Sequence, residues 1–150
     1  MAAYQTIVVG TDGSDSSFRA VDRAAAIAAD ADATLVIASA YHPARQEDIA
    51  RLQDQLGPDV AYQVVGSTPA EEAVRTASER ARFAGAKKID TVVIDGEPVP
   101  TLTRLVTERS ADLLVVGNRG LNTLAGRILG SVPSEAARKS TVDVLIVHTT

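Results

Sequence analysis

The sequence contains no cysteine, and this absence excludes several kinds of site at once. Without thiols the chain has no disulfide framework, no thiolate zinc site and no cysteine nucleophile, and its composition fits a reducing compartment. The two histidines, His42 and His148, lie far apart with no carboxylate or histidine at ligand spacing. We therefore expect no metal site.

Aromatic residues are also scarce, at 3% of the chain. The core must then be built from alanine, valine, leucine and isoleucine, and alanine lets helices lie close to a sheet. With 45% hydrophobic and 23% charged residues, the composition is that of a globular protein. A length of 150 residues predicts a single domain spanning residues 1–150.

Positive charge is in deficit, with a net charge of −4 and a pI near 5.1. This argues against a nucleic-acid-binding protein, which needs a basic face. No positively charged region precedes the first apolar run, as a signal peptide would require. The longest apolar-looking stretch, Ala24 to Tyr41, is interrupted by Asp30 and Asp32 and is too short to span a membrane. We expect a cytoplasmic protein without a membrane partner.

Short apolar runs alternate with amphipathic segments along the chain. The run Ile7 to Val9, closed by a turn at Asp12-Gly13, is typical of a strand buried on both faces. Thr68-Pro69-Ala70-Glu71 is a helix start, with a hydroxyl cap, a first-turn proline and a glutamate three residues after the cap. The predicted strands are 5–11, 34–41, 89–94, 112–117 and 142–147. The predicted helices are 14–30, 68 to a C-terminal cap at Gly85, about 100–110 and about 133–139. Residues 42–67 are expected to form a loop with one short helix.

This alternation predicts the α/β class: a doubly wound, mostly parallel, five-stranded sheet with helices on both faces. Ligands of such sheets bind outside the carboxyl ends of the strands, where the strand order reverses. Two turns are therefore candidates, one after the first strand (residues 10–14) and one after the fourth (residues 117–131).

The second turn carries the strongest pattern. Gly117-Asn118-Arg119-Gly120 is followed, after nine residues, by Gly130-Ser131 at the start of a helix. Glycines let backbone N–H groups converge on an anion, and the helix adds its own unpaired N–H groups and positive dipole end. A plainer interpretation stays open, in which these glycines only end a strand, make a turn and cap a helix. Arg119 and Arg127 are within sequence reach of a phosphate, although loop arginines are usually only solvated.

Gly-x2-Gly-x9-Gly-Ser at such a junction resembles the nucleotide-binding motif of the universal stress protein family. The opening IVVGTDGS, the stretch ADLLVVGNRG, the segment GSVPSEAARKS and the closing VDVLIV are similar to that family in the same order. The resemblance leaves only residues 42–67 uncovered. It implies a Rossmann-like parallel sheet, a homodimer, and ATP or a related adenine nucleotide in the cleft.

Carried over by position, the resemblance implies three groups of site residues. The first turn flanks the adenosine, with the Asp12 carboxylate toward ribose or base, and Ala40 offers backbone groups to the adenine edge. The implied nucleotide-binding residues are Gly10, Thr11, Asp12, Gly13 and Ala40 for the nucleoside, Val116 and Gly117 along the sugar, and Gly120, Gly130, Ser131 and Val132 for the phosphates. Arg127 is added to the predicted site as a loop arginine within sequence reach of a phosphate, not from the resemblance. An Asp-Gly turn before a helix also satisfies local backbone donors by itself, so both roles of Asp12 stay open.

Pro133 departs from the family pattern. Many ATP-binding members have serine or threonine there, whereas proline offers neither a hydroxyl nor an N–H. The short actinobacterial-type members that the chain most resembles are associated with cyclic AMP, so we expect cyclic AMP to bind at least as well as ATP. Magnesium is expected only with ATP.

Other classes fit less well. A dehydrogenase needs a third glycine in the first turn, and a phosphate-accepting receiver domain needs an acid pair and a lysine that are missing. With no Walker lysine and no dedicated base, we expect a binding protein without catalytic residues, and slow ATP hydrolysis is the alternative. The apolar strand Val142 to Val147 is expected at a sheet edge, where it would pair two copies into a homodimer; a dimeric interaction protein that binds no nucleotide is a further alternative.

Overall fold

The computed structural model describes residues 2–41, 68–119 and 131–149, and of Ser131 only the backbone. Its centre is a five-stranded sheet in the order β3-β2-β1-β4-β5, with every neighbouring pair parallel. This confirms the predicted α/β class. The strands are β1 (Thr6–Gly10), β2 (Thr34–Tyr41), β3 (Lys88–Asp95), β4 (Leu113–Gly117) and β5 (Asp143–Val147).

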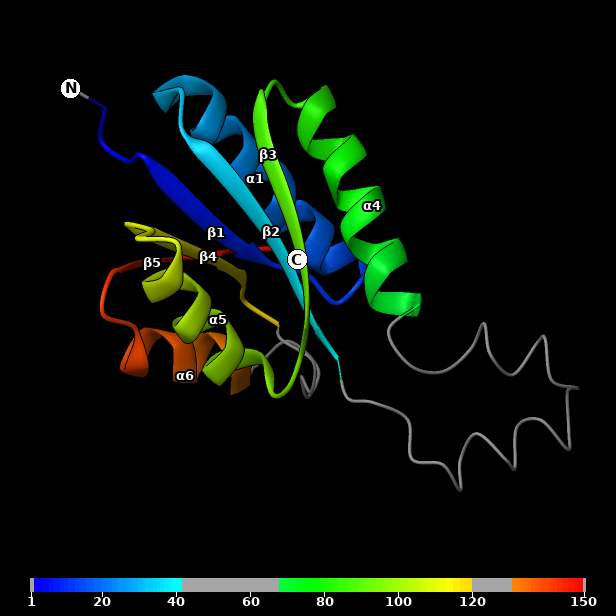
Figure 1. The fold of residues 1–150 in the computed structure, drawn as a ribbon, viewed down its shortest axis with the longest axis vertical. Coiled ribbons are helices and arrows are strands. Elements are labelled where there is room, and N and C mark those ends of the chain that lie inside the picture. The colour runs from blue at the N-terminus through cyan, green and yellow to red at the C-terminus, as the bar shows by residue number, and fades with distance from the viewer. Residues whose placement is uncertain (1, 42–67, 120–130, 150) are drawn as a thin grey trace, which may run out of the picture.

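Helices cover both faces of the sheet (Figure 1). On one face lie α1 (Asp15–Ala31) and α4 (Thr68–Phe83), over a core that includes Ile7, Val9, Leu35 and Ile37. On the other lie α5 (Pro98–Glu108) and α6 (Ser131–Lys139), over a second core that includes Val8. Because successive strand residues point to opposite faces, the run Ile7 to Val9 supplies both cores.

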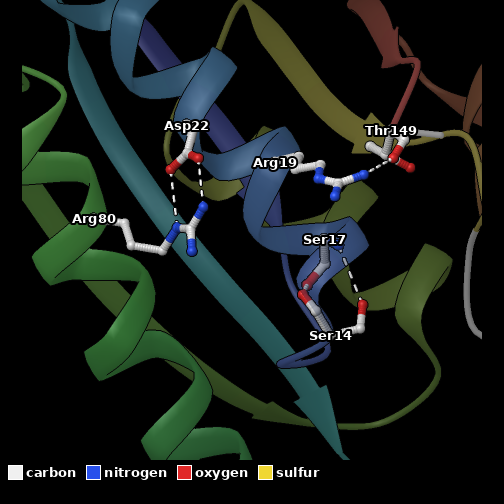
Figure 2. Close-up of polar contacts among 6 residues, drawn as sticks. All are labelled: Ser14, Ser17, Arg19, Asp22, Arg80 and Thr149. Carbon is white, nitrogen blue, oxygen red and sulfur yellow. Dashed lines mark hydrogen bonds and ion pairs between the residues drawn. The ribbon is translucent and has the colours of Figure 1, made fainter.

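Alanine lets α1 and α4 pack closely against the sheet and each other. The buried stripe of α1 includes Ala24, Ala25 and Ala28. A bidentate ion pair then joins the two helices: Arg80 Nε lies 3.0 Å from Asp22 Oδ1, and Arg80 Nη2 lies 2.6 Å from Asp22 Oδ2 (Figure 2).

Gly85 ends α4 as the sequence predicts. Its φ is +106°, a left-handed conformation that glycine adopts without strain. The Gly85 N–H donates to Arg82 O, and the Ala86 N–H donates to Ala81 O at 3.1 Å. This pair of bonds is the Schellman arrangement, which satisfies the last carbonyls of the helix.

Two helix starts differ from the prediction. The sequence placed them at Pro100 and near Pro133, but α5 begins at Pro98 and α6 at Ser131. The first-turn N–H groups of a helix have no intrahelical partner, so a proline beyond the first helical position is tolerated as well. The predicted starts, about Pro100 and near Pro133, are therefore each two residues later than the observed ones.

The predicted loop and short helix within 42–67 lie outside the described residues. The predicted edge position of the last strand is confirmed, because β5 pairs only with β4 in the described sheet. Within the described ranges, no helix has the length and apolar character needed to cross a membrane.

Candidate functional site

A cleft of about 570 Å³, open solvent included, lies at the carboxyl ends of β1, β2 and β4. The chain runs outward from β1 to β2 and β3, then returns to form β4 and β5 on the other side of β1. The strand order therefore reverses between β1 and β4, where doubly wound sheets bind ligands. The cleft is lined by Gly10, Thr11, Asp12, Ser14, Ser16, Ser17, Ala38, Ala40, Pro98, Leu102, Val116, Gly117 and Val132.

Two glycines end the strands at the switch point. A Cβ on Gly10 would lie 3.0 Å from Leu102 Cδ1, so the missing side chain lets α5 approach the end of β1. A Cβ on Gly117 would meet Thr149 Cγ2 at 3.5 Å, an ordinary contact. A methyl group at Gly10 would thus require the Leu102 side chain to shift, whereas at Gly117 the surroundings leave room for one.

The turn between β1 and α1 is held by Asp12. Its Oδ1 accepts hydrogen bonds from Ser14 N at 2.9 Å and from Ser14 Oγ at 2.5 Å. This is the local role that the sequence left open, and it uses one carboxylate oxygen. The other, Oδ2, accepts no hydrogen bond from the described residues and belongs to a residue that lines the cleft.

The two walls of the cleft differ in chemistry. The α1 wall carries the hydroxyl groups of Thr11, Ser14, Ser16 and Ser17. The opposite wall is apolar and comes from Pro98 and Leu102 of α5 and from Val132 of α6. A ligand that fits must therefore present one polar side and one apolar surface.

The cleft brings together most of the residues predicted from the sequence. Gly13 is an exception: it lies in the β1–α1 turn with φ +84° and is not part of the lining, and a Cβ there would lie 3.3 Å from Ala73 Cβ. Ser131 is the first residue of α6. The predicted residues in the lining are Gly10, Thr11, Asp12, Ala40, Val116, Gly117 and Val132, whereas Gly120, Arg127 and Gly130 lie outside the described residues.

Sequence reasoning missed part of both walls. Ser14, Ser16 and Ser17 follow the first turn directly, and their position at a helix N-terminus beside a predicted ligand turn was a usable signal. Pro98 was missed because its helix was expected to begin two residues later. Ala38 and Leu102 carry no signal beyond their hydrophobicity.

Pro133 is fully buried and does not line the cleft. What Pro133 changes beside the cleft is therefore the backbone, because the first turn of α6 lacks one N–H at this residue. Among the side chains that the structure describes, no three histidine or acidic groups come together as metal ligands.

Comparison with known proteins agrees with this geometry. The universal stress protein family model matches residues 3–148. The chain is 59% identical to universal stress protein Rv1636 of Mycobacterium tuberculosis strain H37Rv, over all of both chains. It is 50% identical to a universal stress protein crystallised in complex with cyclic AMP, with a TM-score of 0.77 over 99% of this chain and 100% of that one. The Archaeoglobus fulgidus universal stress protein in complex with dAMP shares the fold, with a TM-score of 0.68 at 21% identity over 95% of this chain and 97% of that one. The chain belongs to the universal stress protein family.

Proposed function

We propose that the cleft binds an adenine nucleotide and that the protein acts as a nucleotide sensor or sequestering module. The observation that carries this proposal is the position of the cleft, at the switch point between β1 and β4 with Gly10 and Gly117 at its edges. The apolar wall offers a surface for a base, and the hydroxyl wall with Asp12 offers partners for a sugar. The relative crystallised with cyclic AMP supports the same ligand class.

The phosphate end of the site is assigned to the start of α6. Its first-turn N–H groups and positive dipole end suit an anion, and Val132 of that turn lines the cleft. Ser131 joins this turn, and the sequence motif adds Gly120, Gly130 and Arg127. Because Pro133 removes one N–H donor there, cyclic AMP binds at least as well as ATP, and Mg²⁺ takes part only with ATP.

Calorimetric titration of the purified protein with cyclic AMP and with ATP plus Mg²⁺ tests this proposal. We expect binding of both, with cyclic AMP at least as tight; a clear preference for ATP would refute the ranking, and binding of neither would refute the function. Ala40→Leu adds bulk inside the cleft and is expected to weaken binding at least tenfold. Its matched control is Ala137→Leu on the exposed side of α6, which should leave affinity unchanged.

Binding without rapid turnover is part of the proposal. Incubation with radiolabelled ATP should release no more than a few equivalents of product per protein over hours. Multiple rapid turnovers would instead establish the protein as an ATP hydrolase.

A homodimer through β5 completes the proposal, for a protein of the cytosol. Val144, Leu145 and Ile146 stay only half-buried on this edge strand, whose outer backbone groups can pair with a second copy. Light scattering after size exclusion should give about twice the 15.7 kDa mass of the chain. A strict monomer at micromolar concentration would contradict the dimer without affecting the nucleotide site.

A further inference from the structure

Four of the residues that line the cleft on the β1–α1 side carry a hydroxyl group, and the hydrogen bonds that these hydroxyls already make decide what they can offer a ligand. They belong to Thr11, Ser14, Ser16 and Ser17. A hydroxyl has one proton to donate, whereas its oxygen has two lone pairs that accept. A hydroxyl whose proton is already used within the protein can only accept from a ligand.

The protons of three of these groups are used within the turn. Ser14 Oγ lies 2.5 Å from Asp12 Oδ1, and because a carboxylate oxygen accepts, Ser14 donates. Ser17 Oγ donates to the Ser14 carbonyl oxygen at 2.9 Å. Thr11 Oγ1 lies 2.7 Å from Ser17 Oγ, and with the Ser17 proton on the carbonyl this contact is a hydrogen bond only if Thr11 donates.

The fourth hydroxyl, that of Ser16, is oriented by its hydrogen bond to Thr149 in the C-terminal segment. The Thr149 N–H donates to the side-chain oxygen of Asn118 at 3.0 Å, which fixes the orientation of that amide. Thr149 Oγ1 donates to the same oxygen at 2.8 Å. Ser16 Oγ lies 2.6 Å from Thr149 Oγ1, whose only proton is used, so Ser16 is the donor in this contact.

We propose that the α1 wall is a hydrogen-bond acceptor surface that selects a nucleotide by its ribose hydroxyls, with Ser16 as the acceptor that Thr149 fixes. This inference rests on the proposed nucleotide function and adds its specificity. The wall presents hydroxyl lone pairs and the open oxygen of Asp12, which suit ligand O–H groups. A phosphate finds no hydroxyl donor there, and Asp12 and Asp15 already place two carboxylates against the positive end of the α1 dipole.

Thr149 acts in this arrangement as a positioning residue. It is buried behind the wall, and Arg19 of α1 donates a further hydrogen bond to its carbonyl oxygen (Figure 2). The Asn118 N–H donates to Val147 O at 2.9 Å, which ties the end of β4 to the end of β5 beside it. Thr149, which is not part of the cleft lining, thus makes Ser16 the donor in the hydrogen bond between them.

Titration calorimetry with adenosine 5′-monophosphate and its 2′-deoxy and 3′-deoxy analogues tests the proposal on the full chain. At least one deoxy analogue should bind about two- to tenfold more weakly, the range expected for one lost hydrogen bond. Equal affinity for all three would overturn the inference and leave the proposed function standing. No binding of the monophosphate or of cyclic AMP would overturn both.

Variants assign this selectivity to Ser16 and Thr149. Ser16→Ala should bring the affinity ratio of the monophosphate to the weaker analogue close to one, whereas Thr107→Ala, which removes an exposed α5 hydroxyl away from the cleft, should preserve it. Thr149→Val keeps the shape of the side chain but removes the acceptor of the Ser16 proton, so the affinity ratio of the monophosphate to the weaker analogue should fall. Thr149→Ser keeps that acceptor, so the ratio should stay at the wild-type value. A ratio that stays at the wild-type value in Ser16→Ala or in Thr149→Val, with thermal unfolding showing a folded protein, would overturn the proposal.

Discussion

Asp32 ends α1 in a backbone conformation that favours glycine. Its φ is +53°, its N–H donates to Ala29 O, and the next N–H, of Ala33, donates to Ala28 O at 2.9 Å. This is the same Schellman arrangement that closes α4 at Gly85, but here a side chain occupies the left-handed position. Aspartate tolerates this conformation better than most residues, yet still at a cost.

Asp32→Gly should therefore stabilise the protein, by about 0.5–1 kcal/mol. The substitution also removes an ion pair with Lys88, but at 3.5 Å between side chains 56% and 77% exposed this pair contributes little. The free energy of unfolding from urea titration measures the change. Asp30→Gly, two residues earlier inside the helix, is the control and should destabilise by a few tenths of a kcal/mol. A loss of stability in Asp32→Gly would contradict the argument.

At the scale of an element, Gly96 lies close against the first turn of α5. Its φ is +141°, and a Cβ there would lie 2.7 Å from the Cγ2 methyl group of Thr101. Thr101 is buried, and its hydroxyl donates to Glu97 O at 2.7 Å and to Pro98 O at 2.9 Å. A side chain at residue 96 therefore pushes against the first turn of α5, which carries part of the apolar wall of the cleft.

Gly96→Ala should destabilise the protein by about 1–3 kcal/mol and weaken nucleotide binding. Adding Thr101→Ser removes the clashing methyl group and keeps the hydroxyl, so it should recover part of the loss. Thr103→Ser, two residues further along α5, makes the same chemical change away from the clash and should recover nothing. Additive effects of the Gly96 and Thr101 changes in a double-mutant cycle would show that the methyl group is not the obstacle.

The elements differ in how far the sequence determines them. The buried strands and the alanine stripes of α1 and α4 could be predicted, because hydrophobic periodicity records which faces are buried. The start of α5 could not, because Pro98 and Pro100 both satisfy the local rules for a helix start. Of the two glycines that line the cleft, Gly117 belongs to the spaced glycine pattern, whereas Gly10 came from the family resemblance. The hydrogen bond between Ser16 and Thr149 joins residues 133 positions apart and has no local signature.

At the scale of the whole molecule, side-chain hydrogen bonds join neighbouring elements at both ends of the strands. At the carboxyl edge, Asn118 and Thr149 join the ends of β4 and β5 to α1 beside the cleft. At the amino ends, the Asp112 carboxylate just before β4 accepts hydrogen bonds from the Gln5 and Thr6 N–H groups at the start of β1. Tyr4 adds a longer link there, because its hydroxyl donates to Asp143 Oδ2 of β5 at 2.9 Å, across the strand that separates β1 from β5.

The Tyr4 link makes stability depend on pH in the alkaline range. The hydrogen bond to Asp143, then burial, then the charges of Asp143 and Asp112 raise the pKa of Tyr4 above its ordinary value of 10.0. The folded protein therefore keeps this proton at a pH where the unfolded chain releases it. The stabilisation is fully present below about pH 10 and is lost as the pH rises through the folded-state pKa.

Thermal unfolding of the wild type and of Tyr4→Phe from pH 7 to pH 11 measures this contribution. The wild type should be the more stable protein by a constant margin up to about pH 9, and the margin should shrink above pH 10, because phenylalanine has no proton to lose. Comparison of the two proteins at each pH cancels the titration of the other groups. Asp143→Asn keeps an acceptor but removes the charge, which brings the folded-state pKa of Tyr4 closer to its unfolded-state value. In that background the margin between the tyrosine protein and its Tyr4→Phe variant should therefore lose less in total as the pH rises to 11. A margin that stays constant to pH 11 would show that the hydrogen bond from Tyr4 to Asp143 does not make stability depend on pH.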